Sequence, residues 1–267
     1  MGIRSGLGRL GLLAMSIAVL VFMYFPLSLV IAYAFNRSGT QSWPPSGFTL
    51  QWIEVALANT GLIDAFRTSV SVALGATALA IVLGSLAALA VGRHRFFGRE
   101  TVSFLLLLPI SLPGVVTGMA LSTTFATTDF PLGFFAIVVG HATFCVVLVY
   151  NNVLARMRRV SGSLEEASAD LGADSFQTFR YVTFPAMRSA ILAGALLAFA
   201  LSFDEVIVTI FVAGGVKTLP IWIFQSFRLA NQVALVNVAG LAAILLSVIP
   251  VYIATRITSD TGAVGRT

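Results

Sequence analysis

The sequence predicts an all-α, polytopic membrane protein with about six transmembrane helices, which form one domain over residues 1–267. Composition is the first reason: apolar residues make up 58% of the chain, charged residues 10%, and the mean hydropathy is +0.95. Such values are typical of helical membrane proteins. The second reason is that the apolar residues form six long runs, at about 10–35, 66–92, 101–125, 131–155, 187–213 and 234–256. Each run supplies the roughly 20 residues that a helix needs to cross a bilayer.

The first run has two possible fates. It follows Arg4 and Arg9 and ends in Ala32-Tyr33-Ala34, an arrangement that also occurs in signal peptides. Its apolar stretch of about 25 residues is much longer than the 7–15 apolar residues of a signal peptide. We therefore expect a retained first span.

Two polar segments separate the runs on the side opposite the termini. The segment 36–64 is rich in turn residues, and its part 48–58 is weakly amphipathic, with Trp52 suited to the membrane interface. The segment 214–231 contains two glycines, Pro220 and Trp222, and we expect a short helix or a re-entrant turn there.

The third run is interrupted by Pro109 and Pro113 and carries Gly114 and Gly118. Proline frees backbone carbonyls, and such breaks occur in membranes where they line a cavity or pack against protein. The two glycines, four residues apart, also permit close helix approach. Packing and a pathway-lining role for Pro113 both remain open.

The distribution of basic residues predicts the orientation. Six spans place both termini on one side, and twelve of the sixteen Lys and Arg residues lie on that side: Arg4, Arg9, Arg93, Arg95, Arg99, Arg156, Arg158, Arg159, Arg180, Arg188, Arg256 and Arg266. The positive-inside rule then places both termini in the cytoplasm. The positive net charge is thus explained by topology, and we expect no nucleic-acid partner.

A polar, helix-forming segment separates the fourth and fifth runs and should face water. Ser163 and Glu166 have the spacing of a capping box, which predicts a helix start. Gly172 suits the position just after a helix end, where the backbone turns left-handed. Asp174 and Gln177 predict a second helix start. The pattern therefore predicts two short helices joined by a glycine turn.

This segment resembles the Glu-Ala-Ala…Gly…Ile-x-Leu-Pro loop of bacterial ABC importer permeases. The matching residues are Glu166-Ala167-Ser168, Gly172 and Val182-x-Phe184-Pro185. Ser168, Val182 and Phe184 depart conservatively from the pattern. The resemblance implies a fold like that of type I ABC importer permeases, whose loop, here residues 157–186, docks on a separate ATPase subunit. The docking residues that it implies are Glu165, Glu166, Ala167, Gly172 and Pro185.

Three further segments, 108–118, 140–144 and 198–209, resemble permeases of the spermidine/putrescine importer group. The likeness extends from the first span to about Leu246. It implies a multi-pass protein of the bacterial cytoplasmic (inner) membrane, in contact with membrane lipid. It also implies a second permease subunit, two ATPase subunits and an extracytoplasmic solute-binding protein. ATP and Mg²⁺ would bind to the ATPase, and we expect no cofactor in this chain.

Asp204 and Glu205 lie within the fifth run, where acidic groups are costly and usually face water or the bundle interior. Adjacent helical residues point about 100° apart, so one carboxylate faces the pathway and the other a partner or a helix end. A polyamine needs carboxylates and aromatic faces along its route. We therefore predict a substrate pathway near Asp204, Glu205, Phe203 and Phe199. The alternative is a structural pair or a helix break near the outer surface.

Several chemistries have no matching pattern. A P-loop needs a Gly-Lys-Ser/Thr sequence, whereas the only lysine, Lys217, follows Val216. The chain is therefore not expected to be the ATPase. Ser, His and Asp residues occur, but no Gly-x-Ser-x-Gly elbow does, so an intramembrane hydrolase has little support and we expect no enzyme. Cys145 is the only cysteine, so no intramolecular disulfide forms. No His or Cys spacing predicts a metal site, and we expect His141 to be hydrogen-bonded in the packing.

Other functions remain open on the sequence alone. An ion-coupled secondary transporter would use Asp204 or Glu205 as a proton carrier, and broken helices fit such a protein too. A membrane assembly or scaffold protein is a third class. Among ABC importers, the cargo could instead be an amino acid, an opine, a phosphonate or iron. The polar segment 163–185 favours the ABC importer, because a secondary transporter has no evident use for it.

Overall fold

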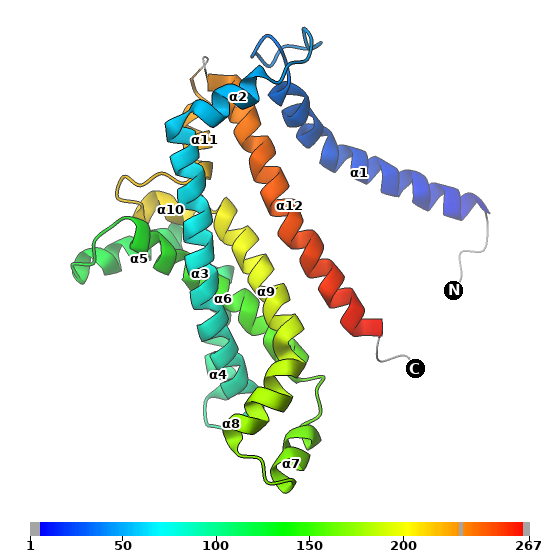
Figure 1. Ribbon diagram of the computed structural model, residues 1–267, viewed down its shortest axis with the longest axis vertical. Helices are drawn as coiled ribbons and strands as arrows, with labels where there is room; N and C mark the ends of the chain where they lie inside the picture. Colours follow the sequence, from blue (N-terminus) through cyan, green and yellow to red (C-terminus); the bar gives the residue numbers. More distant parts are fainter. Residues whose placement is uncertain (1–5, 230–231, 264–267) are drawn as a thin grey trace. The chain divides into compact units, whose positions relative to one another are not determined.

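The structure, a computed structural model, describes residues 6–229 and 232–263, and these are helical almost throughout (Figure 1). Five helical segments are long and apolar enough to cross a membrane: Gly8–Ala34, Thr60–Arg93, Phe134–Met157, Ser175–Asp204 and Val233–Arg256. A bent pair of helices, α4 (Arg99–Ser111) and α5 (Gly114–Thr127), supplies a sixth span if it is counted as one. The prediction of about six spans is confirmed. Among the described residues, β structure is limited to a single bridge between Asn36 and Phe48.

The third run breaks where its prolines predict. α4 and α5 meet at an angle of 105°, and Pro113 lies between them. Leu112, the residue before this proline, is extended with ψ 146°, because a proline ring excludes the helical conformation from its predecessor. Pro109 stays inside α4.

The fifth run differs from its prediction as a single helix over 187–213. α9 (Phe184–Asp204) ends at Asp204, Glu205 is extended, and a separate helix, α10 (Ile207–Val212), follows. The Glu205 carboxylate accepts a hydrogen bond from the Val208 amide of α10, so it satisfies one of the backbone amides that the new helix start leaves without a partner. A run of apolar side chains does not reveal such a break.

The chain forms two compact units. The first comprises the chain up to Ile63 together with Ile223–Ile244, and the second comprises Asp64–Trp222 and the chain from Leu245 on. The prediction of one permease domain over 1–267 stays a prediction.

In the first unit, α1 (Gly6–Ala34) is followed by a folded loop and by α2 (Gln51–Ala58). Asn36 is fully buried and organises the loop. Its side-chain amide donates to the Ser38 hydroxyl and the Thr40 carbonyl, and its backbone carbonyl accepts from the Trp52 indole. Trp52, expected at the membrane interface, therefore packs on this loop. Gly240 on α12 (Val233–Ala263) lies against Val30 of α1.

In the second unit, α6 (Phe134–Met157) is the most buried span. α3 (Thr60–Arg93) runs parallel to it, because Gly75, Gly84 and Gly92 lie against Val138, Val146 and Met157 in turn. At Gly84 an added Cβ would lie 2.8 Å from the Val146 carbonyl oxygen, so only glycine allows this approach.

α9 packs on α6 in the opposite direction. Gly194 lies against Val149, and Ser202 contacts His141 farther along. Spans 2 and 4 (α3 and α6) therefore run parallel and spans 4 and 5 (α6 and α9) antiparallel, as expected when the chain crosses the membrane in alternating directions. The segment 214–231 contains a short helix, α11 (Leu219–Ser226), as predicted, whereas its residues 230 and 231 lie outside the described residues.

Candidate docking element and acidic site

The polar segment folds as the predicted pair of short helices, α7 (Ser163–Asp170) and α8 (Ser175–Thr178). Gly172 has φ +84°, and the amides of Gly172 and Ala173 bond back to the carbonyls of Ala169 and Ser168. This is a complete Schellman ending, which needs a left-handed residue where glycine stands. In Figure 1, α7 and α8 lie at the same end of the second unit as α4.

α8 begins with the predicted capping box. Asp174 accepts a hydrogen bond from the Gln177 amide, and the Gln177 side chain accepts one from the Asp174 amide. A π-helical turn, η1 (Phe179–Thr183), then leads into α9, with Pro185 in its first turn. Proline lacks an N–H, so a widened turn before it accommodates the lost hydrogen bond. Pro185 thus marks the entry to the span, as predicted.

The capping box predicted at Ser163 and Glu166 is wrong. Helix α7 starts at Ser163, but its N-cap is Gly162, which is already helical and provides no side-chain cap. Ser161 takes the capping role instead, because its hydroxyl accepts from the Ser163 amide at 3.2 Å. Glu166 and Ala167 are exposed on α7.

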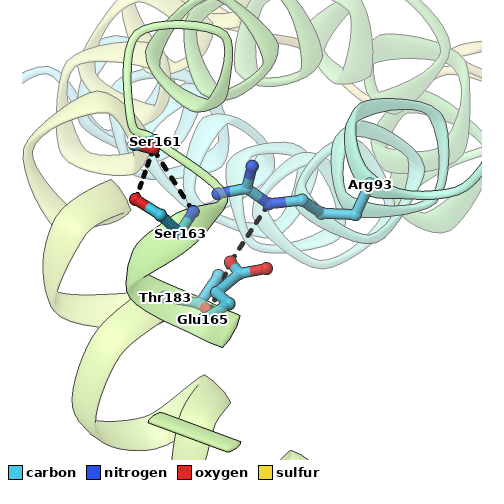
Figure 2. Close-up of polar contacts among 5 residues, drawn as sticks. All are labelled: Arg93, Ser161, Ser163, Glu165 and Thr183. Carbon is cyan, nitrogen blue, oxygen red and sulfur yellow. Dashed lines mark hydrogen bonds and ion pairs between the residues drawn. The ribbon is translucent and has the colours of Figure 1, made fainter. Parts of the chain in front are cut away.

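Glu165 is the acidic residue of α7 that makes contacts within the chain. One of its carboxylate oxygens accepts from Arg93 Nε at 3.0 Å and from Thr183 Oγ1 at 2.8 Å (Figure 2). Arg93 ends α3, and Thr183 ends the π turn, so the three residues join three elements. Sequence reasoning missed this cluster. The one available signal was that Arg93, at the end of a span, and the polar segment that contains Glu165 are predicted to lie on the same side of the membrane.

Large apolar side chains also stand exposed on this element. Leu164, Leu171 and Phe176 are 53%, 89% and 68% exposed. On a polar segment that is predicted to face water, a group of exposed apolar residues is the pattern expected of a protein contact surface. The docking residues predicted from the sequence were two glutamates, Ala167, Gly172 and Pro185, so the prediction missed these three.

At the end of α9 the two adjacent carboxylates have different surroundings. Glu205 is half-buried, and its Oε1 accepts from the Val208 amide at 2.9 Å, so that it caps α10. Asp204 is exposed and has no hydrogen bond or ion pair to the described residues. Glu205 therefore lies at a helix end, one of the two places expected for it, whereas a pathway role for Asp204 stays a prediction.

The aromatic residues beside Asp204 differ as well. Phe203 is buried, with its ring edge-on to Phe66 at 6.2 Å, so it packs in the core. Phe199 is half-buried and stacks on Phe203. Pro113 lies at the α4–α5 break, where the following Gly114 packs on Ile207 of α10. The breaks of the third and fifth runs thus lie close together.

His141 forms the buried polar cluster beside this break. Its Nδ1 and Nε2 lie 2.8 Å from Ser202 Oγ and Thr209 Oγ1, on α9 and α10. Thr209 gives its only hydrogen to the Glu205 carbonyl, so it accepts from Nε2, and Nδ1 of the neutral ring accepts from Ser202. His141 is hydrogen-bonded packing, as predicted. Within the described part of the chain, no three His, Cys, Asp or Glu residues gather as a metal site.

Comparison with known proteins agrees with this architecture. Residues 80–261 match the model of the family "Binding-protein-dependent transport system inner membrane component". The putrescine transport system permease protein PotI of Escherichia coli strain K12 is 34% identical over 217 residues, 78% of this chain and 76% of that protein. The spermidine/putrescine transport system permease protein PotC of Haemophilus influenzae is 32% identical, over 92% of this chain and 95% of its own.

Solved structures share the fold. One chain from the crystal structure of a bacterial ABC transporter involved in the import of the acidic polysaccharide alginate superposes with a TM-score of 0.71 and 16% identity, over 97% of this chain and 99% of its own. The match confirms the architecture of a type I ABC importer permease. Together, these matches show that the chain belongs to the family of inner membrane components of binding-protein-dependent transport systems.

Proposed function

We propose that this chain is the permease subunit of an ATP-driven bacterial importer of polyamines such as putrescine and spermidine. One observation carries the proposal: relatives that share about a third of their residues with this chain, over most of its length, are named as putrescine and spermidine/putrescine permeases. The ion-coupled alternative lacks such support, because the family depends on a solute-binding protein.

The importer contains more than this chain. A second permease subunit completes the translocation pathway, two ATPase subunits bind ATP and Mg²⁺, and an extracytoplasmic solute-binding protein delivers the polyamine. Both termini and the α7–α8 element lie in the cytoplasm. The excess of Lys and Arg on that side supports this orientation.

The α7–α8 element docks on the ATPase. Its support is physical: the pair of capped helices has a fixed shape, and it presents exposed apolar residues together with the Glu166 carboxylate. Exposed apolar residues beside charge are typical of a protein interface.

Gly172 offers a test of docking. No atom lies within 4 Å of an added Cβ at this position, so a substitution acts through the backbone alone. Gly172→Val places a β-branched residue at φ +84°, which is strongly disfavoured, whereas asparagine tolerates that region. We expect Gly172→Val to lose the ATPase on co-purification and Gly172→Asn to retain most of it. Equal retention by both variants would rule the docking role out.

Asp204 supplies negative charge to the polyamine on its route, with Phe199 as the neighbouring aromatic face. The support is an exposed carboxylate that has no protein partner among the described residues, at the end of a membrane span. A cation offsets the desolvation of such a group. Phe203 is left out of this role because its ring packs on Phe66.

The test compares Asp204→Asn with Asp64→Asn, a matched change at another exposed carboxylate. Both keep side-chain size and remove one charge. We expect putrescine uptake by assembled complexes to fall at least about fivefold for Asp204→Asn only, a factor of the size given by one lost charge-assisted contact. Unchanged uptake in the assembled Asp204→Asn complex would refute the role of this carboxylate.

A further inference from the structure

The docking helix α7 is not held in place by a hydrophobic core. None of its eight residues is buried. Two of them, Glu165 and Ser168, are half-buried, and both bond to other elements. Burial of apolar area normally fixes a helix against its neighbours. Here, polar contacts set the orientation of the helix.

Ser168 supplies the weaker contact. Its hydroxyl lies 3.0 Å from Thr178 Oγ1, which joins α7 to α8 within the docking element. Ser168 stands where the related loop pattern has alanine, so this hydrogen bond comes from a departure in this chain. The contact stiffens the element but does not connect it to a membrane span.

Glu165 supplies the connection to the spans. The carboxylate oxygen that binds Arg93 also binds Thr183 (Figure 2). Arg93 is the last residue of α3, whereas Thr183 immediately precedes α9. The Arg93 and Glu165 side chains are 21% and 25% exposed, so water screens their interaction less than at an open surface.

Within the described residues, no other hydrogen bond or ion pair joins α7 to α3. A pocket of about 360 Å³ lies between the end of α3 and the docking element, and Arg93, Glu165 and Thr183 are among its lining residues. Because side-chain packing does not fill this space, a movement of α7 reaches α3 chiefly through the carboxylate.

We propose that Glu165 is a positioning residue that transmits displacement of the docking helix to α3 and α9, while its neighbour Glu166 faces the ATPase. This inference rests on the proposed function, because it takes the ATPase as the partner of α7. Loss of the Glu165 contacts leaves a docked but loosely connected helix. ATP hydrolysis then continues, and less cargo moves for each ATP consumed.

The variants separate the contacts. Glu165→Ala removes both, Thr183→Val removes only the contact to α9, and Glu100→Ala removes an exposed carboxylate from α4 as the matched control. The double change Arg93→Glu with Glu165→Arg reverses the ion pair. It also preserves the contact to Thr183, because a hydroxyl can accept as well as donate.

The first measurement needs neither cargo nor ATP. Spin labels replace the exposed Asp170 on α7, which lies outside the proposed contact residues, and Phe97 in the turn after α3, in a Cys145→Ala background of the assembled complex. We expect a narrow distance distribution in the parent and in Glu100→Ala. It should broaden in Glu165→Ala and narrow again in the reversed pair.

The second measurement is putrescine uptake per ATP hydrolysed, in vesicles that contain the whole importer. We expect this ratio to fall at least about fivefold in Glu165→Ala, because fivefold is the lower end of the range of typical coupling factors between two sites of a protein. The fall should be smaller in Thr183→Val. The reversed pair should restore most of it. An unchanged ratio in Glu165→Ala overturns the inference, whether or not the label distances broaden.

Two outcomes separate this inference from the proposed function. If Glu165→Ala does not assemble, Thr183→Val decides: a lower ratio supports the inference, and an unchanged ratio overturns it. If the parent complex hydrolyses ATP but takes up no putrescine, the proposed cargo is wrong. The label distances then decide on Glu165 alone, with broadening in Glu165→Ala as support and parental distances as refutation.

Discussion

Gly118 lies directly against the ring of Phe211, so closely that an added Cβ would be 2.5 Å from Phe211 Cδ2. The contact joins α5 to α10, which lie side by side (Figure 1). Both helices arise from breaks in longer apolar runs, one at Pro113 and the other at Glu205. Gly118 therefore allows the close helix approach that was predicted for it, while a pathway-lining role for Pro113 stays a prediction.

Substitution of Gly118 should disturb this pair of helices. Gly118→Ala forces the Phe211 ring to move, and overpacking of this kind costs about 1–3 kcal/mol of stability. We expect a lower melting temperature of the purified complex, partly restored by Phe211→Leu in the same chain. Gly11→Ala is the control, because nothing lies within 4 Å of a Cβ there. Equal melting temperatures for the two single variants would contradict the packing.

The adjacent carboxylates should respond differently to truncation. Glu205→Ala removes the cap from the Val208 amide and should cost about 1 kcal/mol, a typical effect of losing an N-terminal cap. Asp204→Ala removes no hydrogen bond to the described residues and should leave the melting temperature near that of the parent. The comparison of the two melting curves tests the capping role. A larger loss for Asp204→Ala would reverse the assignment.

Replacement of His141 should show how much its buried hydrogen bonds stabilise the complex. His141→Leu leaves the hydroxyls of Ser202 and Thr209 without this partner, and a buried unsatisfied group costs about 1–3 kcal/mol. Adding Ser202→Ala should recover part of the loss, because the unpaired hydroxyl is then gone. Thermal unfolding of the three complexes provides the measurement. Additive losses in the double variant would argue against the hydrogen bond to Ser202.

The orientation can be tested with single cysteines in a Cys145→Ala background. Ser42 and Ser161 are both exposed, in the loop after α1 and in the turn before α7. With the termini in the cytoplasm, an impermeant thiol reagent should label Ser42→Cys in intact cells and label Ser161→Cys only after lysis. Labelling of Ser161→Cys from outside would overturn the topology.

The spans and the turns were predictable because their causes are local. An apolar run long enough to cross a bilayer must form a helix, since lipid offers its backbone no hydrogen bonds. Pro113, Gly172 and the Asp174–Gln177 pair act within a few residues of their own positions, and each has the conformation that its residue type favours.

The remaining features depend on contacts that cannot be predicted from the spacing of residues in the sequence. Glu165 lies 72 residues from Arg93, and nothing in either neighbourhood selects that pair. Ser163 and Glu166 have the spacing of a capping box, in which the Glu166 side chain would accept from the Ser163 amide. In the structure that amide donates to the Ser161 hydroxyl instead. At Glu205, hydropathy predicts a continuous helix, whereas in the structure the carboxylate caps a new helix. The roles of Glu166 and Asp204 stay predictions, because their expected partners are other molecules.

The Schellman ending at Gly172 and the capping box at Asp174 make the form of the docking element independent of its outward-facing side chains. Backbone amides and two polar residues close the bend between α7 and α8, and Leu164, Leu171 and Phe176 take no part in that closure. Shape and recognition are therefore encoded by separate residues. If the element docks on an ATPase as proposed, substitutions at those three positions can change which ATPase is recognised while the geometry of the bend stays the same.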